Sequence, residues 1–473
     1  MEHETITATN TAANTVTERM DTLVEEILQL IEEKKYKAVR ELLLENNEVD
    51  IADVLEEIAD ELDIDRAVIV FRTLPKDISA EVFSYMNSDD QINIINAITD
   101  SEISYILEEL AFDDMIDVLE ELPANLVDKI LNQTPAKERE LINTFLNYPE
   151  NCAGSLMTID YVELSRDMTV AQAMAHIKEV GIDSETVYTC YVKDQGRKLL
   201  GIVSLRALVV APDDALVETY MHEDMQVVNV YDDQEEVSNM FKRYGFLAVP
   251  VVDNEGRIVG IITVDDILDV VEEETTEDIE RMGGVLDLED SDTEYLDMSV
   301  WRHVKSRLPW LFLLMCSYVI TGGIISSFEA ALSKVISLVA YMPMLMGTGG
   351  NSGSQSATLV IRGMSIDEID PSDAGMVLWK ELRISVVIGA LLSLLNFARI
   401  CWFDGEGPMI ALAVSASMLV IVVAAKTIGS MLPMAAKKLG IDPALMASPM
   451  ISSLTDMVSV VTYFTMATAI LGI

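Results

Sequence analysis

The most constraining feature of this sequence is a series of long uncharged, largely apolar runs in its last third. These runs cover residues 308–328, 335–361, 384–398, 407–425 and, apart from Asp456, 443–473. About 20 residues are enough for a helix to cross the hydrocarbon core of a bilayer, and the 15-residue run is extended on its amino side by MVLWKEL. The pattern therefore predicts an all-α membrane domain of five helices over residues 301–473.

Charge divides the chain at the same point. Residues 301–473 hold 11 Lys/Arg and 10 Asp/Glu, whereas residues 1–300 hold 21 and 69, a net charge of −48. An acidic surface is unsuited to nucleic acid or anionic lipid, because phosphates are bound by Lys and Arg. It is suited to remaining soluble and to attracting divalent cations. We expect residues 1–300 to be soluble, with no nucleic-acid partner.

The flanking charges predict the orientation in the bilayer. The amino terminus has neither a basic segment nor an apolar core, so we expect no secretory signal there, and residues 1–19 are expected to be disordered. Most Lys and Arg that flank the spans fall on one side, and Lys334 and Arg399 fall on the other. Since basic flanks favour the cytosol, we expect a multi-pass plasma-membrane protein of bacterial inner-membrane type, with a cytosolic amino terminus and the carboxyl terminus outside.

Residues 20–148 have the pattern of short amphipathic helices. Apolar side chains recur at helical spacing, as at Ile103, Ile106, Leu107 and Leu110. The repetition predicts an all-α superhelical domain. Three aspartates, Asp113, Asp114 and Asp117, fall within about one helical turn. Their spacing alone favours a helix cap and a solvated face over a binding site.

Residues 149–270 contain an internal repeat. A unit that begins at residue 155 recurs at residue 219, and each copy reads as a β-α-β-β-α unit with a glycine-containing hairpin turn. Such a repeat resembles a tandem pair of CBS domains, an α/β fold whose clefts bind adenine nucleotides in that family. Thr263 and Asp266 fit its ribose-holding pattern, whereas Ala207 stands where the first copy would have an acid. The resemblance implies ATP in one cleft at most.

Residues 271–300 are predicted to form a long acidic connecting helix that continues from the repeat. Like charges one turn apart destabilise a helix, so a segment this acidic requires counter-ions. Its position directly before the membrane domain favours a cation-sensing role, and the alternative is a solvated linker.

Polar groups within the predicted spans gather in two places. The second span contains GTGGNSGSQSATL, with Gly347, Gly350 and Asn351, and the fifth aligns Ser452, Asp456, Ser459 and Tyr463 on one stripe. Such glycines either pack helices closely or break a helix at an aqueous cavity. A carboxylate at the centre of a membrane helix costs about 2.5–3.5 kcal/mol on insertion scales. Asp456 is therefore predicted to line an ion pathway, and Lys426 is the only candidate for a basic partner. Pro433 and Pro443 are expected to bracket a turn before the fifth span.

The available ligands indicate which ion is bound. Carboxylate, amide, hydroxyl and carbonyl oxygens are hard ligands, and His and Cys do not cluster to bind softer metals. Mg²⁺ keeps most of its water shell and needs only one or two carboxylates. Since one aspartate per chain is little for a divalent ion, we expect a homodimer with the pore at its interface, within the lipid bilayer.

Several runs together resemble the MgtE family of magnesium channels and transporters. They are GTGGNSGSQSATLVIRGM, GSMLPMAAKKLGIDPALMASPMISSLTDMVSVVTYF, YPENCAGSLMT at the start of the CBS repeat, and the helical LAFDDMIDVLEEL. The resemblance covers about residues 25–473. It implies a homodimer with an N domain, a CBS pair, an acidic plug helix and a five-helix pore, in which Asp456 binds hydrated Mg²⁺ and Asn351 lies beside it.

The resemblance also implies a gating mechanism, in which cytosolic Mg²⁺ bridges acids of the N domain, the CBS pair and the plug helix and holds the pore shut. The matching positions are Asp113, Asp117, Glu235, Asp266, Asp269, Glu274, Glu277 and Asp278. Three residues depart from the family pattern. Gly245 replaces an acid in the second CBS unit, Ser459 replaces a frequent glycine, and Lys426 replaces a neutral residue.

Influx of Mg²⁺ driven by the membrane potential is thus the predicted function. Two charges moving inward across 100 mV release about 4.6 kcal/mol. One alternative is transport of Co²⁺, Mn²⁺ or Zn²⁺, and another is a membrane-anchored metal or nucleotide sensor that transports nothing. No enzyme is expected, because no nucleophile–base pair, phosphate loop or catalytic metal motif is present.

Overall fold

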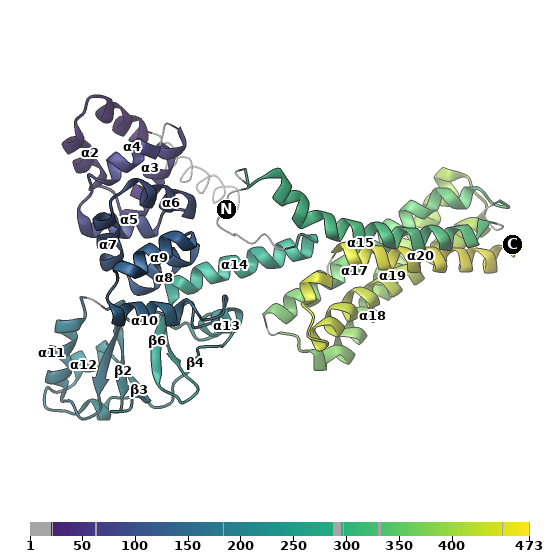
Figure 1. Cartoon of the computed structure of the whole chain (residues 1–473). Helices are drawn as coiled ribbons and strands as arrows, with labels where there is room; N and C mark the ends of the chain where they lie inside the picture. The colour runs from purple at the N-terminus through teal and green to yellow at the C-terminus, as the bar shows by residue number, and fades with distance from the viewer. Residues whose placement is uncertain are drawn as a thin grey trace, which may run out of the picture. The chain divides into compact units, whose positions relative to one another are not determined.

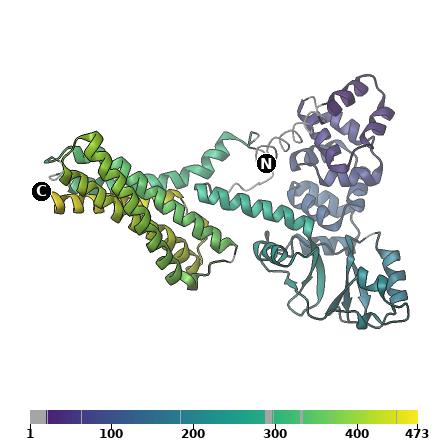
Figure 2. The ribbon, with the colours of Figure 1, turned by 180° about the vertical axis from the view of Figure 1, so that it is seen from behind.

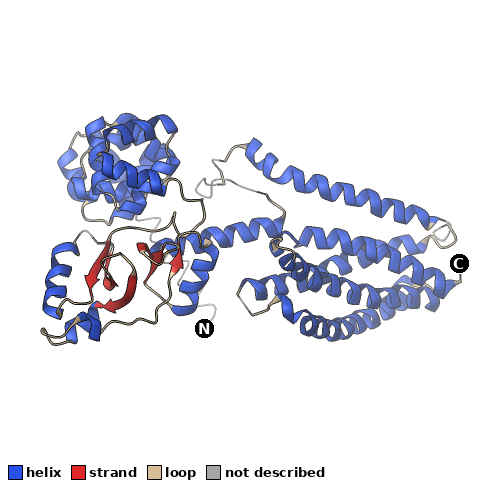
Figure 3. Ribbon diagram, turned by 60° about the horizontal axis from the view of Figure 1, so that its bottom comes forward, coloured by secondary structure: helices blue, strands red, loops and turns tan. Residues whose placement is uncertain are grey.

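The computed structural model describes residues 20, 22–61, 64–182, 184–286, 295–296, 298–329, 333–366, 368–446 and 448–472. The chain forms two compact units, Met1–Val271 and Glu272–Ile473. The first contains short helices and both sheets, and the described part of the second is helical (Figures 1 and 3). The predicted multi-domain fold class is confirmed. The expected disorder of residues 1–19, and part of the predicted connecting helix, lie outside the described residues.

Short helices fill the amino-terminal part of the first unit, as the apolar spacing predicts. They are α2 Tyr36–Leu43, α3 Glu48–Glu61, α4 Ile64–Phe71, α5 Lys76–Ser84, α6 Ser88–Ala97, α7 Asp100–Glu109, α8 Phe112–Glu121, α9 Ala124–Gln133 and α10 Ala136–Phe145. Pro75, Pro123 and Pro135 immediately precede α5, α9 and α10. Proline is favoured at the start of a helix, because the N–H group that it lacks would have no intrahelical hydrogen-bond partner there.

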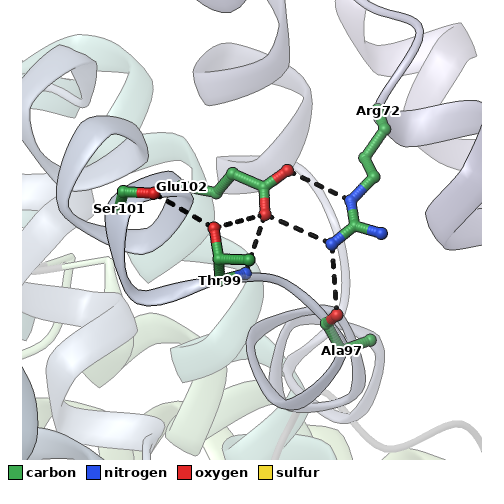
Figure 4. A network of polar contacts seen from close by, with 5 residues as sticks. All are labelled: Arg72, Ala97, Thr99, Ser101 and Glu102. Carbon is green, nitrogen blue, oxygen red and sulfur yellow. Dashed lines mark hydrogen bonds and ion pairs between the residues drawn. The ribbon is translucent and has the colours of Figure 1, made fainter.

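One polar network joins three of these helices (Figure 4). Arg72, just after α4, donates from Nε to Glu102 Oε1 at 3.1 Å and from Nη2 to the carbonyl oxygen of Ala97 at 3.3 Å. Glu102 also accepts a hydrogen bond from the backbone N–H of Thr99 at 2.7 Å, which caps α7. The hydrogen bonds from Thr99, more than the nearby guanidinium, lower the pKa of the Glu102 carboxyl. The network therefore links the residue after α4 to the end of α6 and the start of α7.

The internal repeat forms two similar α/β units, as predicted. The first contains β1 Tyr161–Ser165, α11 Val170–Val180, β2 Thr186–Lys193, β3 Leu199–Ser204 and α12 Leu205–Val210. The second contains β4 Val228–Asn229, α13 Gln234–Tyr244, β5 Ala248–Val252, β6 Ile258–Thr263 and α14 Val264–Gly283. In each sheet the first strand pairs parallel to the second, and the second pairs antiparallel to the third. In the sequence, the short 3-10 helix η1 Val217–Thr219 lies between the two α/β units.

A single apolar core connects the short helices to the second α/β unit. Ile116 and Leu119 of α8 belong to the same buried set as Val249 of β5, Ile262 of β6 and Ile267 of α14. Burial of this continuous apolar surface stabilises the packing of the helical part on the second sheet. The amino ends of α8 and α14, with their aspartates, belong to this one compact unit.

The described residues of the second unit include five long helices that run alongside one another in both views (Figures 1 and 2). They are α15 Val300–Ser327, α17 Ser337–Ser365, α18 Ala374–Arg399, α19 Pro408–Lys438 and α20 Ser448–Leu471. Short 3-10 helices, η2 Pro371–Asp373 and η4 Pro443–Met446, and the short π-helix η3 Ile400–Asp404 lie between them in the sequence. Within the described residues, four helical stretches are long and apolar enough to cross a membrane: Val300–Ser327, Pro371–Asp404, Pro408–Lys438 and Pro443–Leu471. Helix α17 has a similar length but a more polar sequence, because of its glycines, serines, Asn351 and Gln355.

The expected turn between Pro433 and Pro443 begins later than predicted. Helix α19 continues through Pro433 to Lys438, and Gly440 then adopts a left-handed conformation with φ of 72°. Proline is tolerated within membrane helices, since neighbouring helices and local adjustments satisfy the carbonyl that it leaves free.

Helices α17 and α19 cross at two glycines. A Cβ on Gly429 of α19 would collide with the carbonyl oxygen of Gly353 and lie 2.9 Å from its Cα. Small residues allow such close backbone approach, which supplies packing where the hydrophobic effect does not drive helix association. Glycine is therefore required at this crossing.

Candidate ion-binding sites

Asp456 is the carboxylate in the middle of α20, and its side chain is half-buried. Among the described residues, no side chain or backbone group donates a hydrogen bond to it or forms an ion pair with it. The two nearest turns of α20 pack on the glycines of α17. A Cβ on Gly350 would lie 3.3 Å from Ser452 Oγ, and one on Gly349 would lie 2.6 Å from Ser459 Oγ. Close contacts of Gly349 and Gly350 with α20 therefore fix the position of the helix that carries the Asp456 carboxylate.

The other predicted pore residues occupy different environments. Gly347 and Asn351 are exposed on α17, and Gln355 and Thr358 continue the same face at helical spacing. Gly350 is buried and Ser452 half-buried, whereas Ser459 is only 1% exposed, and its hydroxyl has no hydrogen-bond partner among the described residues. The role of this set in ion passage remains a prediction.

A second carboxylate within the helical unit was missed by the sequence reasoning. Glu381 of α18 is 8% exposed and accepts a hydrogen bond from Ser356 Oγ of α17 at 2.6 Å. Lys426 of α19 in turn donates to Ser356 Oγ at 3.1 Å. Lys426, considered from sequence as a partner for Asp456, therefore has a hydrogen-bond partner on another helix. In the sequence Glu381 lies between Lys380 and Arg383 and looks like one of the charges that flank a span.

The first unit contains five carboxylates that interact with one another, here called the acidic cluster. They are Asp113 and Asp114 at the start of α8, Glu185 just before β2, and Asp265 and Asp266 at the start of α14. Asp113 is 9% exposed, and its Oδ1 atom is buried with no hydrogen-bond partner in the described part of the chain. The charged groups that act on Asp113 are Asp114, Glu185 and Asp266, all of them acidic.

Burial and mutual repulsion raise the pKa of these carboxyl groups. Desolvation, followed by the charges of Asp266 and Asp114, raises the pKa of Asp113 to about 8. Desolvation and Asp266 raise the pKa of Asp114 to about 6, and desolvation, Asp265 and Asp266 raise that of Glu185 to about 7. Desolvation also raises the pKa of Asp266, although Thr263 donates a hydrogen bond to it from Oγ1 at 2.7 Å. Protons or cations therefore stabilise this cluster.

The remaining predicted regulatory acids are more dispersed. Asp117 of α8, Glu235 of α13 and Asp269 of α14 are exposed, and the half-buried Glu274, Glu277 and Asp278 belong to the part of α14 in the second unit. Arg281 pairs with Glu277 and, at 2.8 Å, with Asp442. Across the described residues, no three His, Cys, Asp or Glu side chains form a preassembled metal site. Asp114, Glu185 and Asp265 were absent from the predicted site.

Gly245, which replaces an acid of the family pattern, has a conformational explanation. It ends α13 with φ of 67°, in the left-handed region, and a Cβ there would meet no neighbour within 4 Å. Glycine is favoured at this position after a helix, because other residues are strained at positive φ.

A helical apolar unit whose Asp456 carboxylate has no partner among the described residues, joined to an acidic α/β unit, has the character of a membrane transport protein for cations. The chain matches the divalent cation transporter family over residues 342–466, the MgtE intracellular N domain over 46–151, and the CBS domain over 153–214 and 217–273. It is 36% identical to the magnesium transporter MgtE of Thermus thermophilus, over 93% of this chain and 99% of that one. It is 32% identical to MgtE of Bacillus subtilis, over 87% and 93% respectively. The chain belongs to the MgtE family.

Two solved structures are similar to part of this chain. The soluble part of a magnesium transporter is 30% identical, with a TM-score of 0.50, and the match covers 54% of this chain and 99% of that one. The cytosolic domain of the Mg²⁺ channel MgtE in complex with ATP is 34% identical, with a TM-score of 0.49 and coverage of 52% and 99%. Membership of a transporter family and the four apolar helices among the described residues that are long enough to cross a membrane identify the chain as a multi-pass membrane protein, and not an enzyme.

Proposed function

We propose that this protein carries Mg²⁺ into the cytosol along a pathway that includes Asp456. The observation that carries the proposal is the carboxylate within an apolar helical unit, without a hydrogen-bond or ion-pair partner among the described residues. A charge in a bilayer is costly unless it faces a polar pathway or an ion. Relatives named magnesium transporter over nearly their whole length support Mg²⁺ as the ion.

The working unit is a homodimer in this proposal. The face of α17 with Gly347, Asn351, Gln355 and Thr358 is exposed in the single chain. Amide side chains are poorly accommodated by lipid, so a second copy supports this face better than hydrocarbon does. Two copies also bring two Asp456 carboxylates to one hydrated Mg²⁺, which needs only one or two. Native mass spectrometry of the detergent-solubilised protein measures this oligomeric state.

The acidic cluster supplies the gate in this proposal. Without divalent cations its charges repel one another and loosen the first unit, and bound Mg²⁺ removes this repulsion and favours a closed state. Coupling between ion occupancy and conformation is necessarily reciprocal. The other predicted regulatory residues also bind cations in this proposal. They are Asp117, Glu235 and Asp269 in the first unit, and Glu274, Glu277 and Asp278 in the second.

The raised pKa of Asp113 predicts a pH-dependent stability in cation-free buffer. A carboxyl whose pKa is higher in the folded state than in the unfolded one stabilises the fold below about pH 4, and this stabilisation is lost as the pH rises through about 8. In EDTA, we expect the melting temperature of the whole protein to fall between pH 5.5 and 8.5, with faster proteolysis of the first unit. Millimolar Mg²⁺ should suppress the change.

Asp113→Asn should remove a large part of that pH dependence, because it eliminates the buried ionisation. Asp128→Asn is the matched control, since Asp128 lies exposed on the neighbouring α9. Equal pH dependence in wild type and Asp113→Asn would show that the cluster does not carry the effect.

ATP binding at the second CBS unit is a further part of the proposal. Thr263 and Asp266, the predicted ribose-binding pair, are hydrogen-bonded at the junction of β6 and α14. Because Asp266 also belongs to the acidic cluster, ATP and Mg²⁺ would act on the same carboxylate. Calorimetric titration of ATP into wild type and Thr263→Ala, with and without Mg²⁺, tests both binding and coupling.

Uptake into proteoliposomes tests the transported ion and its direction. An inside-negative potential should drive Mg²⁺ entry, and an inside-positive potential should reduce it. Co²⁺, Mn²⁺ and Zn²⁺ should each compete more weakly than unlabelled Mg²⁺. Stronger competition by one of them would indicate a different substrate, and no uptake by folded protein would favour the non-transporting sensor. The proposed topology, with the amino terminus inside and the carboxyl terminus outside, is measured by protease access to tags.

A further inference from the structure

Three buried polar side chains connect α17, α18 and α19, and we call Glu381, Ser356 and Lys426 the buried trio. Ser356 is 0% exposed, Lys426 4% and Glu381 8%. The hydroxyl of Ser356 donates to Glu381 Oε2 at 2.6 Å and accepts from Lys426 Nζ at 3.1 Å. The hydroxyl uses one donor and one acceptor, so each role requires its own partner.

The trio balances one negative and one positive charge inside the helical unit. A buried charge is strongly destabilising when its partner is removed, whereas removal of both charges is often tolerated. The only described group bonded to the ammonium of Lys426 is the Ser356 hydroxyl. Helices α17 and α19 cross closely at Gly353 and Gly429, which places Ser356, one turn from Gly353, beside α19.

The two carboxylates within the helices therefore differ in one respect. The Glu381 carboxylate accepts a hydrogen bond from the Ser356 hydroxyl, which accepts one from the Lys426 ammonium. Among the described residues, no cationic side chain pairs with the Asp456 carboxylate. Without the ammonium, the carboxylate of Glu381 and the hydroxyl of Ser356 would be hard oxygen ligands facing the volume that the Lys426 side chain had filled. Hard oxygen ligands favour hard cations, and the single negative charge of Glu381 would be balanced by one monovalent alkali ion.

We propose that Lys426 is a built-in substitute for a monovalent cation. Its ammonium neutralises Glu381 and occupies a site that would otherwise bind Na⁺ or K⁺ between α17, α18 and α19. Ion movement at Asp456 therefore does not require Na⁺ or K⁺. Lys426 is responsible for this independence as a positioning residue, without contact to the transported ion. Only this last consequence rests on the proposed transport function.

The test measures binding without relying on transport. The full-length protein is unfolded thermally in choline chloride, NaCl and KCl at equal ionic strength. Lys426→Ala should melt lower than wild type in choline and regain about 3 °C or more in NaCl or KCl. Wild type and the double variant Glu381→Gln/Lys426→Ala should show no alkali-specific gain, because one retains the ammonium and the other lacks the carboxylate.

The absence of any alkali-specific gain in Lys426→Ala would overturn the proposal. If that variant does not fold, Lys426→Met is compared with Glu381→Gln/Lys426→Met. Higher stability of this double variant would support charge compensation, and equal or lower stability would show that the lysine acts by packing alone. A Na⁺ or K⁺ requirement for Mg²⁺ uptake that appears only in Lys426→Ala would extend the result to transport. If no variant transports Mg²⁺, the proposed function fails while the binding result stands.

Discussion

Replacement of Asp456 by asparagine is expected to abolish Mg²⁺ uptake into proteoliposomes held at an inside-negative potential. The amide preserves the shape of the side chain and the helical packing of α20, but it removes the charge that attracts the ion. One unit charge pair at 4 Å in a partly buried site contributes about 4 kcal/mol. A loss of uptake of roughly 100-fold or more is therefore expected, and it is measured with a fluorescent Mg²⁺ indicator trapped in the vesicles.

Glu406→Gln is the matched control for this variant, because it makes the same carboxylate-to-amide change between η3 and α19. It should retain most of the wild-type uptake. Native mass spectrometry and melting temperatures must show that Asp456→Asn is folded and assembled like the wild type. Equal uptake by wild type and Asp456→Asn would place the ion pathway away from Asp456.

Gly429→Ala is expected to have the largest effect on stability in the helical unit. The added methyl group would meet backbone atoms of Gly353, which cannot rotate away as a flexible side chain can. Overpacking of a well-packed interior costs about 1–3 kcal/mol, and the helices α17 and α19 would have to separate. We expect a lower melting temperature, broadened gel filtration and loss of uptake, since α17 carries both the exposed polar face and Ser356.

Gly323→Ala on α15 is the control for this second prediction. A Cβ there meets nothing within 4 Å, and alanine has a higher helix propensity than glycine by about 1 kcal/mol. The control should therefore be at least as stable as wild type. Equal stability of the two variants would mean that α17 and α19 do not cross as closely as described.

The sequence predicted most of the secondary structure correctly, because those features are local. The uncharged runs identified the long helices, the apolar spacing identified the short helices, and the repeat identified two α/β units. The turn expected at Pro433 was wrong in its start, because neighbours there override local preference. Pro433 continues within α19, since the surrounding helices support its freed carbonyl.

The candidate sites were predicted less completely. Asp456 was found from sequence because a charge inside an apolar run is visible without a structure. Glu381 was missed because Lys380 and Arg383 accompany it in the sequence, and only helix packing brings it to Ser356 and Lys426. Similarly, Asp113 was assigned a cap-like role from spacing alone, whereas its unpartnered oxygen and its acidic neighbours come from the core that joins α8 to α14.

Composition and periodicity by themselves thus determined an acidic soluble part, a helical membrane part and one conspicuous carboxylate. The partners of each charge were decided only by the tertiary structure. Hydropathy is a property of a continuous segment, whereas a buried charge is stabilised by groups from other helices, whose identity depends on packing and distance. For that reason Lys426 was visible in the sequence as an unusual charge, and its connection through Ser356 to Glu381 became apparent only in the folded chain.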